Sequence, residues 1–464
     1  MRELTKGSPA KVIMTFALPI IFGNLLQQLY NLADGKIVST YVGTQAFAAV
    51  GATAVIANLI IGFVNGVTQG FGIPISRCFG AGDYKNMRRY VAGSFIMTVA
   101  MTLILTVGAL LGIEGLLHIL DTPADIMEEA LQYIRIIIMG TAFISLYNYS
   151  ANILRAVGES RIPLICLAVA VILNIFLDIL FVHTFSMGLR GAAHATNIAQ
   201  CIAGVLCMAY LLFRFRELVP KGQEWQMQRR KYQEMTVFGI SLGMMSCFVS
   251  IGTVIFQTAV NRLGTKIVTA HIAARRIEEL TNVPMLCTGM AMTTYASQNL
   301  GAGEYDRIKK GIHQAFVIVL VQGVIFTTFC WIFGHPLIRW ITSSNDTYIL
   351  DTAYRYLTRN TSFYFVLGPL FVLRCSLQGL EHKVIPVASS ILELVLKIVS
   401  TIWIVPVLGY TGVIYTEPII WIFMTLMLIG GYVRALKQIN EAEHIKSARN
   451  AKAENEKINV DNRL

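Results

Sequence analysis

The chain has 464 residues, of which 55% are hydrophobic and only 14% are charged, and its formal net charge is +11. So little polar surface excludes ordinary water-soluble globular domains. The sequence contains no HExxH or Walker motif and its eight histidines are dispersed, so we expect a membrane protein that is not an enzyme.

Twelve apolar segments follow one another along the chain, and each is long enough to cross a hydrocarbon core of roughly 30 Å as a helix. They lie at residues 12–38, 46–75, 90–113, 131–153, 162–184, 189–213, 236–261, 267–297, 309–333, 353–376, 384–406 and 411–435. The first segment contains Gln27, Gln28 and Asp34 and has no small-residue cleavage site, which favours a transmembrane helix over a signal peptide. The pattern predicts an all-α integral membrane protein.

Lysines and arginines are concentrated in alternate loops. The loops 76–89, 214–235 and 299–310 and both chain ends are basic, whereas the loop 113–130 has five acidic residues and no Lys or Arg. By the positive-inside rule, both termini are predicted to be cytoplasmic in a multi-pass protein of the cell membrane. This distribution of charge also argues against a nucleic-acid partner. The eight cysteines form no CxxC pair, so no fixed metal site is expected.

The chain repeats itself at a constant spacing. The segment GAGDY that begins at Gly80 returns as GAGEY at Gly301, 221 residues later, and Ser76 matches Ser297 at the same spacing. Six spans in each copy predict two six-helix bundles related by a pseudo-two-fold axis along the membrane normal. The predicted parts are an N-terminal lobe at 1–213, a cytoplasmic linker at 214–235, a C-terminal lobe at 236–437 and a polar cytoplasmic tail at 438–464. The tail can bury no core and is expected to be frayed.

Four polar side chains fall within predicted spans of the first lobe. Asp34 lies in the first span, Asn174 and Asp178 share one face of the fifth at i,i+4, and Thr196 lies in the sixth. A carboxylate at this depth costs about 3 kcal/mol unless it is paired, protonated or facing water. The oxygens of these residues are suited to bind a proton or Na⁺. The alternative is that Asp34 or Asp178 is a loop-end residue in water or a helix cap.

Counted from the paired prolines Pro163 and Pro386, Lys397 of the second half matches Asn174 of the first, and counting back from the paired glycines moves this match by two residues. Glu393 lies one turn before Lys397, and Glu417 matches Thr196. We expect a static internal ion pair, and the alternative is a second protonation site.

A further group of charges lies in the eighth predicted span. It is either a water-exposed wall of balanced charge or a substrate contact, and it consists of Arg275, Arg276, Glu278 and Glu279. Soft side chains near the predicted cleft would suit flat cations, although at helical spacing they also serve ordinary packing. The candidates are Tyr147, Met244, Met245, Met285 and Met290.

Several short segments, taken in order, resemble the multidrug and toxic compound extrusion (MATE) family, and its DinF-like prokaryotic branch in particular. They are Leu18-Pro19 with Asp34, Gly43 with Ala48-Ala49-Val50-Gly51, Gly80-Ala81-Gly82, Leu154-Arg155-Ala156-Val157-Gly158 with Pro163, and Asn174 with Asp178. The resemblance implies a secondary antiporter that exports organic cations or other amphipathic toxins in exchange for H⁺ or Na⁺. It also implies a cation site at Asp34, Asn174, Asp178 and Thr196.

The chain departs from the NorM-type branch of that family, which has an acidic residue in the seventh span. Here the region contains only Ser246, Cys247, Val249 and Ser250, so coupling through a carboxylate of that helix is not expected. The implied partners are small cationic or amphipathic molecules and the lipid bilayer, with no cofactor besides the coupling ion and a monomeric state. The alternative function is a flippase for a lipid-linked oligosaccharide or a related lipid.

Overall fold

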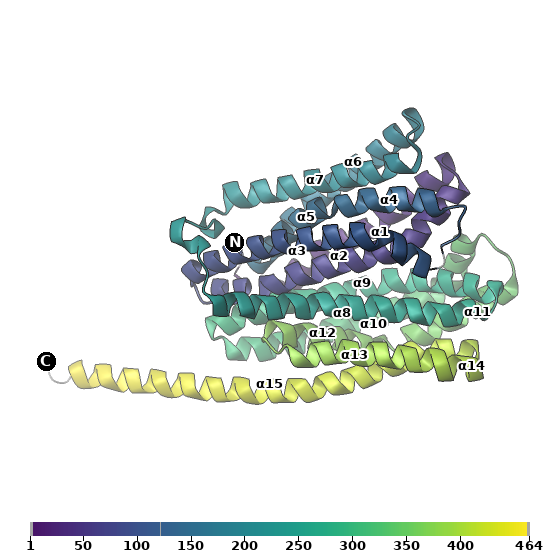
Figure 1. Ribbon diagram of the computed structural model, residues 1–464. Coiled ribbons are helices and arrows are strands. Elements are labelled where there is room, and N and C mark those ends of the chain that lie inside the picture. Colours follow the sequence, from purple (N-terminus) through teal and green to yellow (C-terminus); the bar gives the residue numbers. More distant parts are fainter. Residues whose placement is uncertain (1–2, 121, 462–464) are drawn as a thin grey trace.

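The computed structural model describes residues 3–120 and 122–461, and the described residues form helices and connecting turns only (Figure 1). Long apolar helices are expected here, because a helix satisfies its own backbone hydrogen bonds in lipid. Glycines and short polar turns separate these helices. Gly43 and Gly264, which match in the repeat, each have a positive φ and directly precede a helix.

The first lobe contains seven α-helices, two of which form one bent span. They are α1 (Pro9–Tyr41), α2 (Thr44–Gly80), α3 (Tyr84–Ile119), the pair α4 (Met127–Met139) and α5 (Thr141–Ala156), α6 (Arg161–Asp178) with the π-helical turn η1 (Ile179–Thr184), and α7 (Gly188–Arg214). The bend between α4 and α5 is 40°.

The second lobe repeats this order after two short 3₁₀ turns, η2 (Arg216–Leu218) and η3 (Gly222–Trp225). Its helices are α8 (Arg229–Asn261), α9 (Thr265–Ala302), α10 (Tyr305–Thr342), the pair α11 (Thr347–Thr361) and α12 (Tyr364–Gly379), α13 (Val384–Val399) with the π-helical turn η4 (Ser400–Ile404) and α14 (Val405–Leu408), and α15 (Tyr410–Asp461). Each of the twelve predicted spans corresponds to one helix or one bent or continuous set of helices.

Within the described residues, nine helices are long and apolar enough to cross a membrane, and the bent pair α4–α5 makes ten. The other two predicted spans are α9 and the pair α11–α12. Helix α9 has 38 residues, ample for a bilayer, but four consecutive or near-consecutive charged residues lower its hydropathy. Two of these charges, Arg275 and Glu278, pair with each other inside the lobe, as described below.

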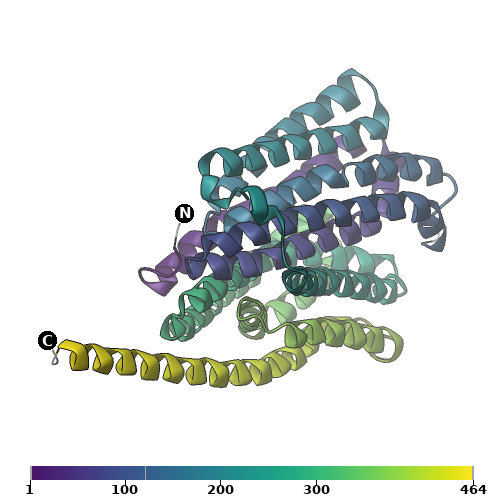
Figure 2. The same ribbon diagram turned by 60° about the vertical axis from the view of Figure 1, so that its left-hand side comes forward.

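The two lobes lie side by side, with α1–α7 in one layer and α8–α15 in the other (Figures 1 and 2). Both chain ends and the η2–η3 linker lie at the same end of the helices, which we call the terminal side; the opposite end is the distal side (Figure 1). On the terminal side, a guanidinium from the first lobe joins the lobes: Arg77 forms ion pairs with Glu234 of α8, at 3.1 Å, and with Glu381 after α12.

Helices α2 and α8 cross closely because glycines of each face the other. A Cβ atom at Gly70 would lie 2.5 Å from the Phe238 carbonyl oxygen, and one at Gly243 would lie 2.7 Å from Val67. Small residues allow two helix backbones to approach in lipid, where dispersion contacts replace the hydrophobic effect. This crossing holds the two lobes together.

Two boundaries differ from the sequence prediction. Helix α8 begins at Arg229, so the segment between lobes is shorter than 214–235, and Arg88 of α3 holds it through two hydrogen bonds of 2.7 Å to Glu224. The segment after residue 437 is not frayed as expected, because α15 continues as helix to Asp461 (Figure 1). Ile439 is buried, and Lys309 binds Glu443 at 2.7 Å, so contacts with the bundle extend the helix.

Candidate cation site and inter-lobe cavity

The first-lobe polar residues come from three neighbouring helices. Asp34 lies on α1, Asn174 and Asp178 lie on the last turns of α6, and Thr196 lies on α7. The side chain of Asp178 is fully buried and Asn174 is 1% exposed, so Asp178 is not a loop-end residue in water. The π-helical turn η1 begins directly after Asp178, and such turns often occur at functional sites.

Several polar atoms of this group are buried without a hydrogen-bond partner among the described residues. They are Oδ1 of Asp34, both carboxylate oxygens of Asp178 and both amide atoms of Asn174. Asp34 and Asp178 lie near each other, and two ionised carboxylates cannot satisfy one another. Buried polar groups are normally paired, so this set of oxygens fits a proton or a hard cation such as Na⁺.

Two tyrosines complete the surroundings of this group. The hydroxyl groups of Tyr30 and Thr196 are 3.1 Å apart, and Tyr133 of α4 lies in the same region as the two carboxylates. Both tyrosines are buried. Sequence reasoning missed them; Tyr30 could have been found, because it lies one helical turn before Asp34 on the same face. A cavity of about 10 Å³ between Tyr30 and Asn174 is near the minimum for one water molecule.

The second lobe holds a buried ammonium at the matching place. Lys397 is 2% exposed, and its Nζ lies 3.0 Å from Glu393, 3.2 Å from Glu417 and 3.4 Å from the Thr253 hydroxyl. The expected ion pair is therefore a three-membered cluster. The π-helical turn η4 lies at the end of α13 as η1 lies at the end of α6, so the repeat preserves the backbone irregularity although the side chains differ.

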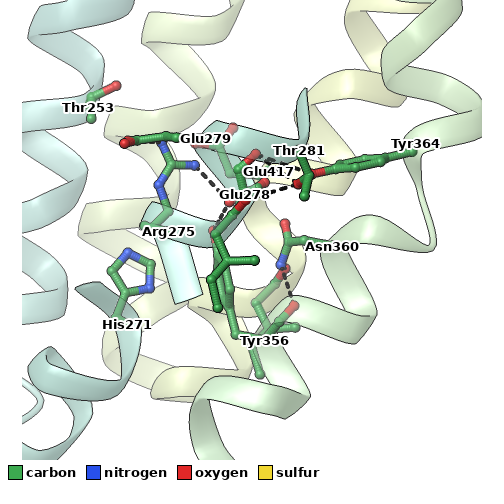
Figure 3. A network of polar contacts seen from close by, with 12 residues as sticks. Thr253, His271, Arg275, Glu278, Glu279, Thr281, Tyr356, Asn360, Tyr364 and Glu417 are labelled. Atoms are coloured by element: carbon green, nitrogen blue, oxygen red, sulfur yellow. Dashed lines mark hydrogen bonds and ion pairs between the residues drawn. The ribbon is translucent and has the colours of Figure 1, made fainter. Parts of the chain in front are cut away.

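The four charges of α9 separate into two pairs. Glu278 is fully buried; it accepts hydrogen bonds from Arg275, at 3.0 Å, and from the Tyr356 hydroxyl, at 3.1 Å (Figure 3). Arg276 and Glu279 are exposed, although Arg275 also reaches Glu279 at 3.7 Å. Neither interpretation from the sequence describes all four residues, because Arg275 and Glu278 form an interior pair whereas Arg276 and Glu279 are exposed.

The aromatic and methionine candidates are mostly packing residues. Tyr147 lies inside the first lobe, where its hydroxyl donates to the Pro163 carbonyl at 3.2 Å. The expectation that Tyr147 lies near the cleft between the lobes is therefore wrong. Met285 is fully buried in the core of the second lobe, and Met245 is also buried, whereas Met244 is 36% exposed. Only Met290 of these residues lines a cavity between the lobes.

That cavity has a volume of about 30 Å³ and lies among α1, α2 and α5 of the first lobe and α9 of the second. Its polar lining residues are Gln69, Ser76, Asn152, Arg155, Thr293 and Thr294. Arg155 belongs to the LRAVG segment, which the sequence analysis used only to support the resemblance.

Comparison with known proteins gives the same duplication. The family model described as MatE matches the chain twice, at residues 19–180 and 242–403. The chain is 26% identical over 402 residues to the probable multidrug resistance protein YpnP of Bacillus subtilis, covering 87% of this chain and 88% of the relative. It is also 26% identical over 345 residues to the probable multidrug resistance protein NorM of Thermotoga maritima, covering 72% of each.

The fold is shared with a solved structure described as the outward-facing conformation of a multidrug resistance MATE family transporter of the MOP superfamily. The TM-score is 0.85 at 24% identity, and the match covers 95% of this chain and 98% of the solved chain. The predicted all-α membrane fold with twelve spans is thereby confirmed. Since the two matches of the family model account for more than half of the sequence, the chain belongs to the MatE family of membrane transporters and is not an enzyme.

Proposed function

We propose that this protein is a cation-coupled antiporter of the cell membrane that exports organic cations and amphipathic drugs or toxins by alternating access, as a monomer with cytoplasmic termini. The carrying observation is the group of buried, unpartnered oxygens of Asp34 and Asp178 beside Asn174. The names of the relatives, multidrug resistance and multidrug export proteins, support drug export over the flippase alternative.

The coupling ion is H⁺ or Na⁺, bound at Asp34, Asn174, Asp178 and Thr196. A bound cation neutralises two buried carboxylates, so occupied and empty sites favour different arrangements of α1, α6 and α7. Exchange requires that ion and substrate have opposite effects on one two-state equilibrium. Competition of a cationic substrate and the coupling ion for the same negative charge provides such an effect.

The contacts between the two lobes support the interpretation that this conformation is outward-facing. The ion pairs of Arg77 with Glu234 and Glu381 join the lobes on the terminal side, which the positive-inside rule makes cytoplasmic. In the proposed cycle these contacts break when the protein opens inward to load substrate. They form again when the lobes rock outward and release it.

The test is efflux of a fluorescent organic cation from proteoliposomes driven by a pH gradient or, separately, by a Na⁺ gradient. We expect one of the two gradients to drive efflux by the wild type, and Asp34→Asn and Asp178→Asn to abolish that driven component. Asp125→Asn is the matched control, because Asp125 lies exposed in the loop before α4. Equal gradient-driven efflux by wild type and Asp34→Asn would overturn the assignment of the coupling site.

A further inference from the structure

A positive charge lines the inter-lobe cavity without a negative one. Of the residues that line it, Arg155 alone is charged, and its polar neighbours are hydroxyl and amide groups. Arg155 stands on the last turn of α5, and the opposite wall is α9 of the second lobe, with Thr293 and Thr294. Closure of the lobes on the terminal side therefore encloses a guanidinium at their interface.

This guanidinium has little compensation. It donates one hydrogen bond, from Nη1 to Oδ1 of Asn152 at 3.2 Å, and its buried Nε has no partner among the described residues. No described carboxylate forms an ion pair with Arg155, whereas Arg77 binds two and Arg88 binds Glu224 in two hydrogen bonds. The Arg155 side chain is partly buried and its positive charge has no carboxylate partner among the described residues, so the arrangement favours a bound anion.

The matching arginine of the second lobe differs in its surroundings. Arg374 on α12 donates to the Ser390 hydroxyl of α13, and Glu393 follows one turn later on that helix. Helix α6, which corresponds to α13, has no acidic residue before Asp178, so Arg155 lacks the equivalent carboxylate. The repeat thus places a carboxylate one turn beyond the arginine's hydroxyl partner in the second lobe and has no acidic residue on the matching helix before Asp178 in the first.

We propose that Arg155 binds the carboxylate or phosphate group of transported amphipathic molecules, so that the substrates include anionic and zwitterionic amphiphiles. The planar guanidinium can bind such a group through two parallel hydrogen bonds, and the nearby hydroxyls of Ser76 and Thr293 offer further donors. This inference rests on the proposed function, since it assumes export of amphipathic molecules through the interface between the lobes.

The size of the cavity determines when binding takes place. Ligand pockets usually measure about 300–1,000 Å³, whereas this cavity holds about 30 Å³, enough for an anionic group but not for a whole drug molecule. The substrate must therefore enter while the lobes are apart on the terminal side. A bound anion then neutralises Arg155 as the lobes close, which makes closure of the loaded protein more favourable than closure of the empty one.

The test is equilibrium binding of two dyes to the purified full-length protein in detergent, measured by fluorescence anisotropy without any ion gradient. The dyes are a rhodamine with a free carboxylate and its methyl ester, which differ only in the anionic group. We expect the wild type to bind the acid about tenfold more tightly than the ester, as for a hydrogen-bonded charge pair. Arg155→Gln should bind both dyes equally, Arg155→Lys should keep part of the preference, and Arg374→Gln should keep all of it.

The proposal is overturned if wild type and Arg155→Gln show the same ratio of affinities. If the wild type binds neither dye, the measurement is repeated with Arg77→Gln, which loses both inter-lobe ion pairs, and absence of an acid preference there also overturns it. Binding of inorganic phosphate at Arg155 together with equal affinities of the wild type for acid and ester would assign the site to free anions and reject the substrate group. Because no gradient is used, failure of the ion coupling proposed above would leave these results unchanged.

Discussion

Gly80 and Gly301, which match in the internal repeat, pack reciprocally across the interface between the lobes. A Cβ atom at Gly80 would lie 1.9 Å from the carbonyl oxygen of Gln298, and one at Gly301 would lie 2.0 Å from the carbonyl oxygen of Arg77. Arg77 and Gln298 are themselves 221 residues apart, the same spacing as the two glycines. The pseudo-two-fold axis therefore passes between the terminal-side ends of α2 and α9, where only hydrogen atoms fit.

We predict that Gly80→Ala or Gly301→Ala destabilises the closed terminal side. The added methyl group would collide with a backbone carbonyl, and overpacking of this kind costs about 1–3 kcal/mol. The expected result is a lower melting temperature in detergent and an increased reactivity of a cysteine introduced at Thr294, which lines the inter-lobe cavity. Gly108→Ala is the control, because a Cβ atom there meets nothing within 4 Å; a matching loss in that variant would contradict the prediction.

The ion pairs of Arg77 with Glu234 and Glu381 should favour the state that is closed on the terminal side over the state that is open there. Arg77→Gln leaves Glu234 with its 2.6 Å hydrogen bond from Tyr90 but removes the link between lobes, including the one to Glu381. We expect a shift toward the state that is open on the terminal side, seen as a longer distance between spin labels placed on the exposed residues Lys85 and Lys310. An unchanged distance distribution would show that these pairs do not hold the lobes closed.

The buried cluster of Lys397, Glu393 and Glu417 should stabilise the folded protein. Lys397→Met leaves Glu393 and Glu417 in the lobe without their shared cation, and loss of one member of a buried ion pair costs about 3–5 kcal/mol. A large fall in melting temperature is expected. The triple variant that adds Glu393→Gln and Glu417→Gln should recover much of the loss, because it removes the uncompensated charge. A single variant as stable as the wild type would exclude this account.

The linker contact should make stability depend on pH. Hydrogen bonds from Arg88 hold the pKa of Glu224 below its ordinary value of 4.5. Because the folded-state pKa is lowered, this contribution is complete above pH 4.5 and is lost as the pH falls through the folded-state pKa. We expect the difference in melting temperature between wild type and Glu224→Gln to disappear in that acidic range. A difference that is independent of pH would assign the effect to packing.

The sequence by itself determined the membrane fold, the number of spans and their duplication. These properties follow from apolar segment length, from the positions of Lys and Arg and from a constant spacing between identical residues, all of which are local or countable. It also singled out Asp34 and Asp178, because an ionisable residue within an apolar span is unfavourable without a function or a partner.

Only the tertiary structure decided which polar groups have partners. Helical periodicity places Arg275 and Arg276 side by side, but the packing of α9 turns Arg275 toward Glu278 and leaves Arg276 exposed. Periodicity likewise cannot reveal that Arg374 meets Ser390 while Arg155 meets no carboxylate among the described residues. Compensation of a buried charge depends on side chains from other helices, and the distances between helices are set by packing rather than by local sequence.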